Sequence, residues 1–127
     1  MKLVKLIIVS RHGQRTPIHC TKEDKEYFKQ NVQLLQNPET QVFSGQLTKR
    51  GYEQHKQLIQ LFQQKHPAFF SSLQPEHVFA RATNFDRVVL SAQAELEQLN
   101  IKVDVFVEKG EDPFLFQNSK RYNDFSK

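Results

Sequence analysis

The sequence is short of several features that mark specialised classes of protein. It has one cysteine, Cys20, one methionine and no tryptophan in 127 residues. A single cysteine cannot form an internal disulfide, so a disulfide-stapled secreted scaffold is excluded. No apolar run approaches the roughly 20 residues that cross a bilayer. With neither a bridge nor a membrane span in the sequence, we expect a cytoplasmic protein.

The sequence also has little excess of one charge over the other. The 18 basic and 14 acidic residues leave a formal net charge of +4, and this excess is spread along the chain. Such a balance favours anionic ligands mildly, and no basic stripe interleaved with aromatic residues indicates a nucleic-acid surface. The histidines and the cysteine do not have the spacing of a metal site. We therefore expect no nucleic-acid partner, no metal and no cofactor.

The most informative stretch is Leu3–Pro17, LVKLIIVSRHGQRTP. Its apolar first half is mostly leucine or β-branched and predicts a buried strand, typically of a parallel sheet. A glycine and a proline then end the strand. Arg11, His12 and Arg15 therefore fall in the loop past its carboxyl end, where open α/β sheets bind ligands. Lys5 inside the apolar run argues against a secretory signal peptide.

Helical and extended patterns alternate along the rest of the chain. We expect helices over residues 21–36, 49–65 and 84–99, with Thr21, Thr48 and Thr83 as capping residues, and strands over 77–81 and 101–107. The order β, α, α, β, α, β predicts an α/β protein with a parallel sheet flanked by helices. The length predicts one domain over residues 1–127. Residues 108–127 are expected to form an irregular tail.

The arginines and histidine of the loop suit phosphate chemistry. Arginine presents a planar fork of donors that matches phosphate oxygens, and a neutral imidazole can attack phosphorus. A nearby backbone carbonyl that takes the Nδ1 proton of His12 would leave Nε2 free as the nucleophile. Arg81 ends the second predicted strand, beside the end of the first, and the next helix begins close by. We predict that Arg11, Arg15 and Arg81 surround His12.

Four motifs, in this order along the chain, resemble one family. Residues 11–17, RHGQRTP, resemble the RHGxRxP signature of the histidine acid phosphatases, in the branch of the histidine phosphatase superfamily that includes prostatic and lysosomal acid phosphatases and phytases. Residues 47–51 resemble the LTxxG helix start of that family, residues 81–94 the segment with its third phosphate-binding arginine, and residues 112–115 a weaker aspartate-leucine segment. The resemblance implies a phosphoglycerate-mutase-like α/β fold, represented by its amino-terminal portion and therefore truncated.

The same resemblance implies phosphomonoester hydrolysis through a phosphohistidine at His12, with phosphate bound by Arg11, Arg15 and Arg81. The substrates would be phosphorylated small molecules or phosphoproteins. In the family, a later histidine followed by an acid completes the site and protonates the leaving alcohol. No other histidine of this sequence is followed by such an acid. Asp86 is the candidate for a substitute general acid.

Two alternatives stay open because that element is missing. The chain would be a non-catalytic phosphate-binding module if no group replaces the acid. It would be a fragment, self-associating through the exposed edge of its sheet, if the native protein is longer. His55 lies on the apolar face of the helix predicted over residues 49–65 and is interpreted as structural.

Overall fold

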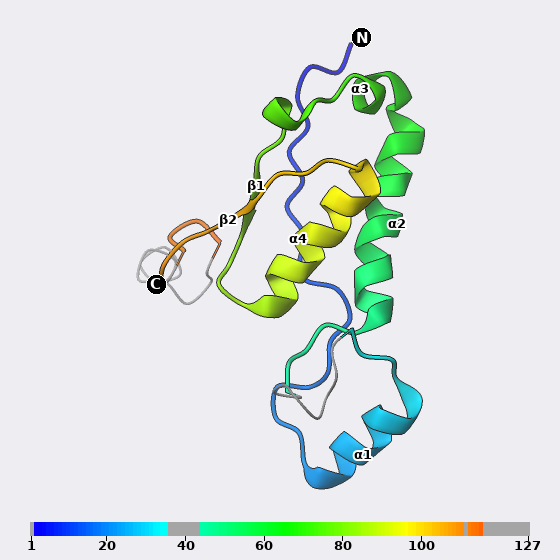
Figure 1. The fold of residues 1–127 in the computed structure, drawn as a ribbon, viewed down its shortest axis with the longest axis vertical. Helices are drawn as coiled ribbons and strands as arrows, with labels where there is room; N and C mark the ends of the chain where they lie inside the picture. Colours follow the sequence, from blue (N-terminus) through cyan, green and yellow to red (C-terminus); the bar gives the residue numbers. More distant parts are fainter. Residues whose placement is uncertain (1, 36–43, 111, 116–127) are drawn as a thin grey trace, which may run out of the picture.

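A computed structural model of the chain describes residues 2–35, 44–110 and 112–115. Its elements are α1 (Lys22–Asn31), α2 (Lys49–Lys65), α3 (Pro67–Ser71), a 3₁₀ turn (Pro75–His77), β1 (Ala80–Ala82), α4 (Asp86–Leu99) and β2 (Val105–Val107). Figure 1 shows α2 and α4 side by side, with β1 and β2 on the side of α4 away from α2. Helix α1 lies at the opposite end of the molecule from α3 (Figure 1).

The helices begin and end largely where local chemistry predicts. The Thr21 hydroxyl accepts from the Asp24 N–H while the Asp24 carboxylate accepts from the Thr21 N–H, a complete capping box. The Thr48 hydroxyl caps α2, and Asn100 ends α4 in the left-handed conformation at φ 55°. The expected cap at Thr83 is wrong, since Phe85 is the N-cap of α4 and its side chain makes no capping bond.

The two strands pair in parallel through the crossover helix α4. The register places Ala80 opposite Val105, Arg81 opposite Phe106 and Ala82 opposite Val107. Helix α4 contacts both strands on one side and α2 on the other. The buried centre of the molecule includes Leu47, Ile59, Ala82, Ala94 and Leu96. The predicted α/β class with a parallel sheet is confirmed.

The prediction of a buried strand over residues 3–9 is wrong. That segment has no strand partner in the described part of the chain, and Val4, Ile7 and Val9 are 84%, 74% and 82% exposed. Over residues 5–9 the run alternates between exposed and half-buried positions, as an extended segment with one covered face does. Composition favours extended backbone locally, but burial of both faces needs neighbours on each side.

Other predicted boundaries shift. The strand predicted over 77–81 is Ala80–Ala82, preceded by the 3₁₀ turn, and the strand predicted over 101–107 covers only Val105–Val107. Helix α1 ends at Asn31 because Val32 is extended, and Leu34 forms an isolated bridge with Thr48 instead of continuing the helix. Residue 36 of the predicted helix, and residues 116–127 of the predicted tail, lie outside the described residues. Among the helices that the structure describes, none is long and apolar enough to cross a membrane.

Candidate active site

The ring of His12 is oriented by the backbone next to it. Its Nδ1 donates a hydrogen bond to the Gly13 carbonyl over 2.8 Å, so Nε2 carries the free electron pair. The Arg15 Nε–H points at that Nε2 from 3.4 Å, a long donor contact that only an unprotonated nitrogen accepts. The loop geometry therefore presents a half-buried imidazole with Nε2 available as a nucleophile.

The surroundings of His12 favour the neutral ring. Burial lowers the pKa of His12, and the positive charges of Arg15, Arg87 and Arg11 lower it further, in that order. The hydrogen bond to the Gly13 carbonyl acts in the opposite direction and reduces the shift without reversing it. A neutral imidazole is the form that attacks an electrophile.

This lowered pKa predicts a pH-dependent term in stability. Between the lowered value and about 6.5, the unfolded chain binds a proton at His12 more readily than the folded chain does. The stabilisation is fully present above about 6.5 and is lost as the pH falls through the folded pKa. We expect the free energy of unfolding, relative to the His12→Asn variant, to rise with pH across that window. Urea titrations in phosphate-free buffer measure this difference, and a flat difference would contradict it.

Helix α2 holds the loop through a close approach of two backbones. A Cβ added to Gly13 would lie 2.6 Å from the carbonyl carbon and 2.7 Å from the Cα of Gly51, so only glycine allows this contact. The Thr48 N–H donates to the Gln14 carbonyl over 2.9 Å, and its hydroxyl donates to the same oxygen over 3.1 Å. The amino-terminal turn of α2 and the loop are therefore one packed unit.

Two further segments fasten the loop. Thr16, fully buried, donates its N–H to the Gln46 carbonyl and accepts from the Gln46 N–H at its hydroxyl, both over 2.9 Å. From α4, the Ser91 hydroxyl accepts from the Gly13 N–H over 3.1 Å and donates to the Arg87 carbonyl over 2.7 Å. His12 is thus held at a junction of the loop, α2 and α4.

Three arginines place positive charge near His12, and no carboxylate among the described residues pairs with them. The charges of Arg15, Arg87 and Arg11 all lower its pKa, and none of the three forms an ion pair within the described residues. The buried Nε of Arg87 has no hydrogen-bond partner there, and burial together with Arg15 lowers the Arg87 pKa. Such uncompensated positive charge favours the binding of an anion.

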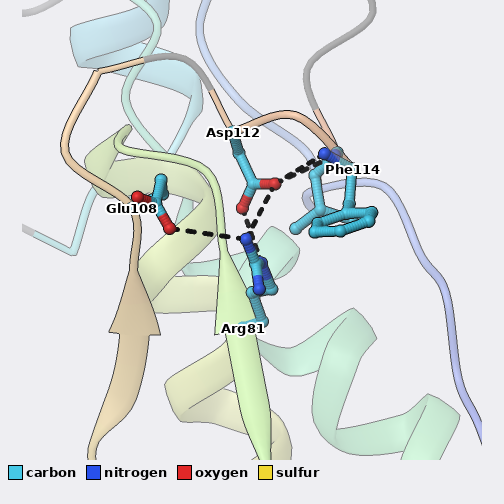
Figure 2. A network of polar contacts seen from close by, with 5 residues as sticks. Arg81, Glu108, Asp112 and Phe114 are labelled. Carbon is cyan, nitrogen blue, oxygen red and sulfur yellow. Dashed lines mark hydrogen bonds and ion pairs between the residues drawn. The ribbon is translucent and has the colours of Figure 1, made fainter.

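Arg81, a predicted phosphate ligand, is paired with carboxylates in the structure. Its Nε donates to Asp112 Oδ2 over 2.7 Å and its Nη2 to Oδ1 over 3.2 Å, and Glu108 lies 3.6 Å away. Figure 2 shows this network, with the guanidinium group facing Asp112 and Glu108. The ring centroids of Phe106 and Phe114 lie 5.1 and 5.0 Å from the guanidinium carbon of Arg81.

The contacts of Arg81 stabilise the turn that follows β2. Asp112 is 2% exposed, and its Oδ1 also accepts from the N–H groups of Phe114 and Leu115. Arg81 holds the pKa of the Asp112 carboxyl below its usual range. Arg81 therefore fastens the turn over residues 112–115 to β1, and it has carboxylate partners that Arg11, Arg15 and Arg87 lack among the described residues. Its role as a phosphate ligand stays a prediction.

The residue that sequence reasoning missed is Arg87. It follows Asp86 in the first turn of α4, six positions after Arg81 in the same segment that resembles the family. The signal was its place at a helix start next to the carboxyl end of a strand, where anions are favoured. Asp86 itself is exposed, and no hydrogen bond or ion pair joins it to His12 within the described residues. Those residues also hold no cluster of three or more metal-ligating side chains.

A loop histidine whose unprotonated Nε2 is contacted by Arg15, near two further arginines that form no ion pair among the described residues, is the arrangement of an anion-binding site in an α/β protein. Comparison with known families specifies the class further. The family "Histidine phosphatase superfamily (branch 2)" matches residues 2–117, and the chain belongs to that family. The resemblance found in the loop and helix motifs is thereby confirmed.

Individual acid phosphatases are similar to this chain over most of its length. Lysosomal acid phosphatase of Homo sapiens is 39% identical over 93 residues, which are 72% of this chain and 20% of that protein. Testicular acid phosphatase of Mus musculus is 35% identical over 98 residues, covering 76% and 22%. Prostatic acid phosphatase of Homo sapiens is 33% identical over 100 residues, covering 78% and 23%. The chain spans about a fifth of the length of these curated relatives.

Proposed function

We propose that this chain accepts a phosphoryl group on His12 and acts as a phosphomonoesterase of the histidine acid phosphatase type. Its substrates are phosphate monoesters of small molecules or proteins. The single observation that carries the proposal is the state of His12, whose Nδ1–H is engaged by the Gly13 carbonyl while Arg15 contacts Nε2 and the charges of Arg87 and Arg11 also act on the ring. The family supports it, since the similar proteins are named acid phosphatases.

The chemistry follows from those positions. The Nε2 electron pair attacks phosphorus, the P–O bond to the alcohol breaks, and that bond's electron pair leaves with the alcohol oxygen. The arginines stabilise the negative charge on the phosphoryl oxygens, with Arg11, Arg15 and Arg87 as the proposed ligands. Water then attacks the phosphohistidine, releases inorganic phosphate and returns Nε2 to its free form. The engaged Nδ1–H keeps the ring oriented through both steps.

The leaving alcohol needs a proton, and its source separates the proposed enzyme from the alternative. Asp86 stays the candidate within this sequence, and it lies exposed in the first turn of α4 beside Arg87. A general acid typically contributes about 10²–10⁴-fold in rate. Without one, an aryl phosphate with a good leaving group reacts best. A chain that binds phosphate without transfer would be the phosphate-binding module.

Transfer of labelled phosphoryl groups tests the proposal. The chain is mixed with ³²P-labelled p-nitrophenyl phosphate, quenched in base, in which phosphohistidine survives, and digested for mass spectrometry. We expect one labelled peptide carrying His12 and at least an equal amount of released p-nitrophenol. Release in excess of label indicates turnover. Absence of label, with inorganic phosphate still raising the Tm, favours the binding module over the enzyme.

Substitution of two arginines tests which one binds phosphate. We expect Arg87→Met to weaken binding of inorganic phosphate by about 10- to 100-fold, the value of one charge-assisted hydrogen bond. Its Tm without phosphate should be unchanged or higher, because a partly buried unpaired cation is removed.

Arg81→Met is the matched control. It should lower the Tm, because the buried Asp112 carboxylate loses its partner, while phosphate affinity stays unchanged at temperatures where the chain is folded. Isothermal titration and thermal melts separate the two effects. The assignment fails if Arg81→Met loses phosphate affinity and Arg87→Met keeps it.

A further inference from the structure

One buried histidine outside the proposed phosphoryl site contacts the loop that carries the nucleophile. His55, in the middle of α2, is 5% exposed. Its Nε2 lies 2.9 Å from the Arg11 carbonyl oxygen and its Nδ1 lies 3.3 Å from Glu95 Oε2 of α4. The ring therefore joins three segments that are distant in sequence, namely the loop, α2 and α4.

The chemistry of the two contacts assigns the protons. A carbonyl oxygen only accepts hydrogen bonds, so Nε2 of His55 carries a proton and donates it to Arg11. The other nitrogen faces a carboxylate at ion-pair distance but forms no hydrogen bond with the residues that the structure describes. The contact that meets hydrogen-bond geometry is thus the one to the loop, and Glu95 of α4 lies at ion-pair distance on the opposite side of the ring.

The position of that bond along the chain matters for His12. The Arg11 carbonyl belongs to the peptide that immediately precedes His12, and the Gly13 N–H, held by Ser91, belongs to the peptide that follows it. With both flanking peptides fastened, the direction of the His12 side chain is set by α2 on one side and α4 on the other. Displacement of a reacting group by about 1 Å can cost about 10²-fold in rate.

We propose that His55 is a positioning residue for the His12 nucleophile, acting through its hydrogen bond to the Arg11 carbonyl. This inference rests on the proposed phosphoryl transfer at His12. His55 does not touch the phosphoryl group, so its loss changes the rate of transfer more than the affinity for phosphate. The sequence alone indicated a structural histidine on an apolar helix face, and the contact with the loop assigns it a more specific task.

A matched pair of variants tests the proposal. The amide nitrogen of glutamine in His55→Gln reaches about as far as Nε2 and can donate to the Arg11 carbonyl, whereas the shorter side chain of His55→Asn cannot. With p-nitrophenyl phosphate, we expect His55→Asn to lower the single-turnover phosphorylation rate about 10- to 100-fold. His55→Gln should keep it within about fivefold of the original rate. Affinity for inorganic phosphate should change by less than about threefold in either variant.

The phosphorylation rate and the affinity for inorganic phosphate together separate positioning from a general effect on folding. Both are measured below each variant's melting transition, where the chain is folded. Equal loss of rate in both variants would overturn the proposal, as would a full rate in His55→Asn. So would a loss of phosphate affinity as large as the loss of rate. His55→Leu, which has no donor for the Arg11 carbonyl, should lower the phosphorylation rate as much as His55→Asn does.

Nuclear magnetic resonance keeps the inference testable if no phosphoryl transfer occurs. With ¹⁵N-labelled histidine, His12 should show the Nδ1–H form in the unsubstituted chain and in His55→Gln. In His55→Asn its ring signals should shift or divide between the two tautomers. Unchanged His12 signals in His55→Asn would overturn positioning by His55. If the His12 ring signals shift as expected but no phosphoryl label is found on the chain, only the proposed function is contradicted.

Discussion

Replacement of His12 by alanine is expected to abolish both the labelling of the chain and its turnover of p-nitrophenyl phosphate. The side chain that attacks phosphorus is removed, and alanine supplies no nucleophile in its place. Loss of a covalent nucleophile costs at least about 10³-fold in rate. Because the three arginines remain, inorganic phosphate should still bind. The measurement is the labelled quench experiment together with a phosphate titration.

His19→Ala is the matched control for that experiment. His19 lies exposed in the same segment, and no hydrogen bond or ion pair involving its ring occurs within the described residues. We expect labelling and turnover equal to those of the unsubstituted chain. Activity that survives His12→Ala at the original rate would refute the phosphohistidine mechanism. Loss of activity in both variants would indicate damage to the loop.

Gly51→Ala is expected to destabilise the chain by about 3 kcal/mol, although alanine normally stabilises a helix by about 1 kcal/mol relative to glycine. An added Cβ would lie 2.6 Å from the Gln14 backbone nitrogen and 2.8 Å from Leu47 Cδ1. The first contact is with backbone, which cannot rotate away, so the loop has to separate from α2. Separation of the loop from α2 would also move His12 and reduce the rate of phosphoryl transfer.

Gln57→Ala on the exposed side of the same helix is the matched control. Gln57 is exposed, so its replacement should change the free energy of unfolding by less than about 0.5 kcal/mol. Urea denaturation of the two variants measures the difference. A Gly51→Ala variant as stable as Gln57→Ala would mean that the close approach of Gly13 and Gly51 does not hold the loop in solution.

Local patterns predicted the elements that need little help from distant residues. Helix α2 spans Lys49–Lys65 as expected, because Thr48 caps it, its apolar residues share one face and Pro67 follows its end. The tautomer of His12 was also predictable, since the accepting carbonyl belongs to the next residue. Capping by Thr83 was wrong because a bend over Asn84 and Phe85, in which the Phe85 N–H donates to the Thr83 carbonyl over 2.8 Å, separates Thr83 from α4.

The sequence by itself determined the α/β class, the helices α2 and α4, and a loop that presents a histidine among arginines. The tertiary structure decided which charges meet. Arg81 and Arg87 are six residues apart and chemically identical, yet the first is bonded from β1 to Asp112, and the charge of the second, on α4, acts on His12. Local composition specifies backbone conformation and charge, whereas the partners of a charge, and the exposure of Val4 or Ile7, depend on which distant segments pack against it.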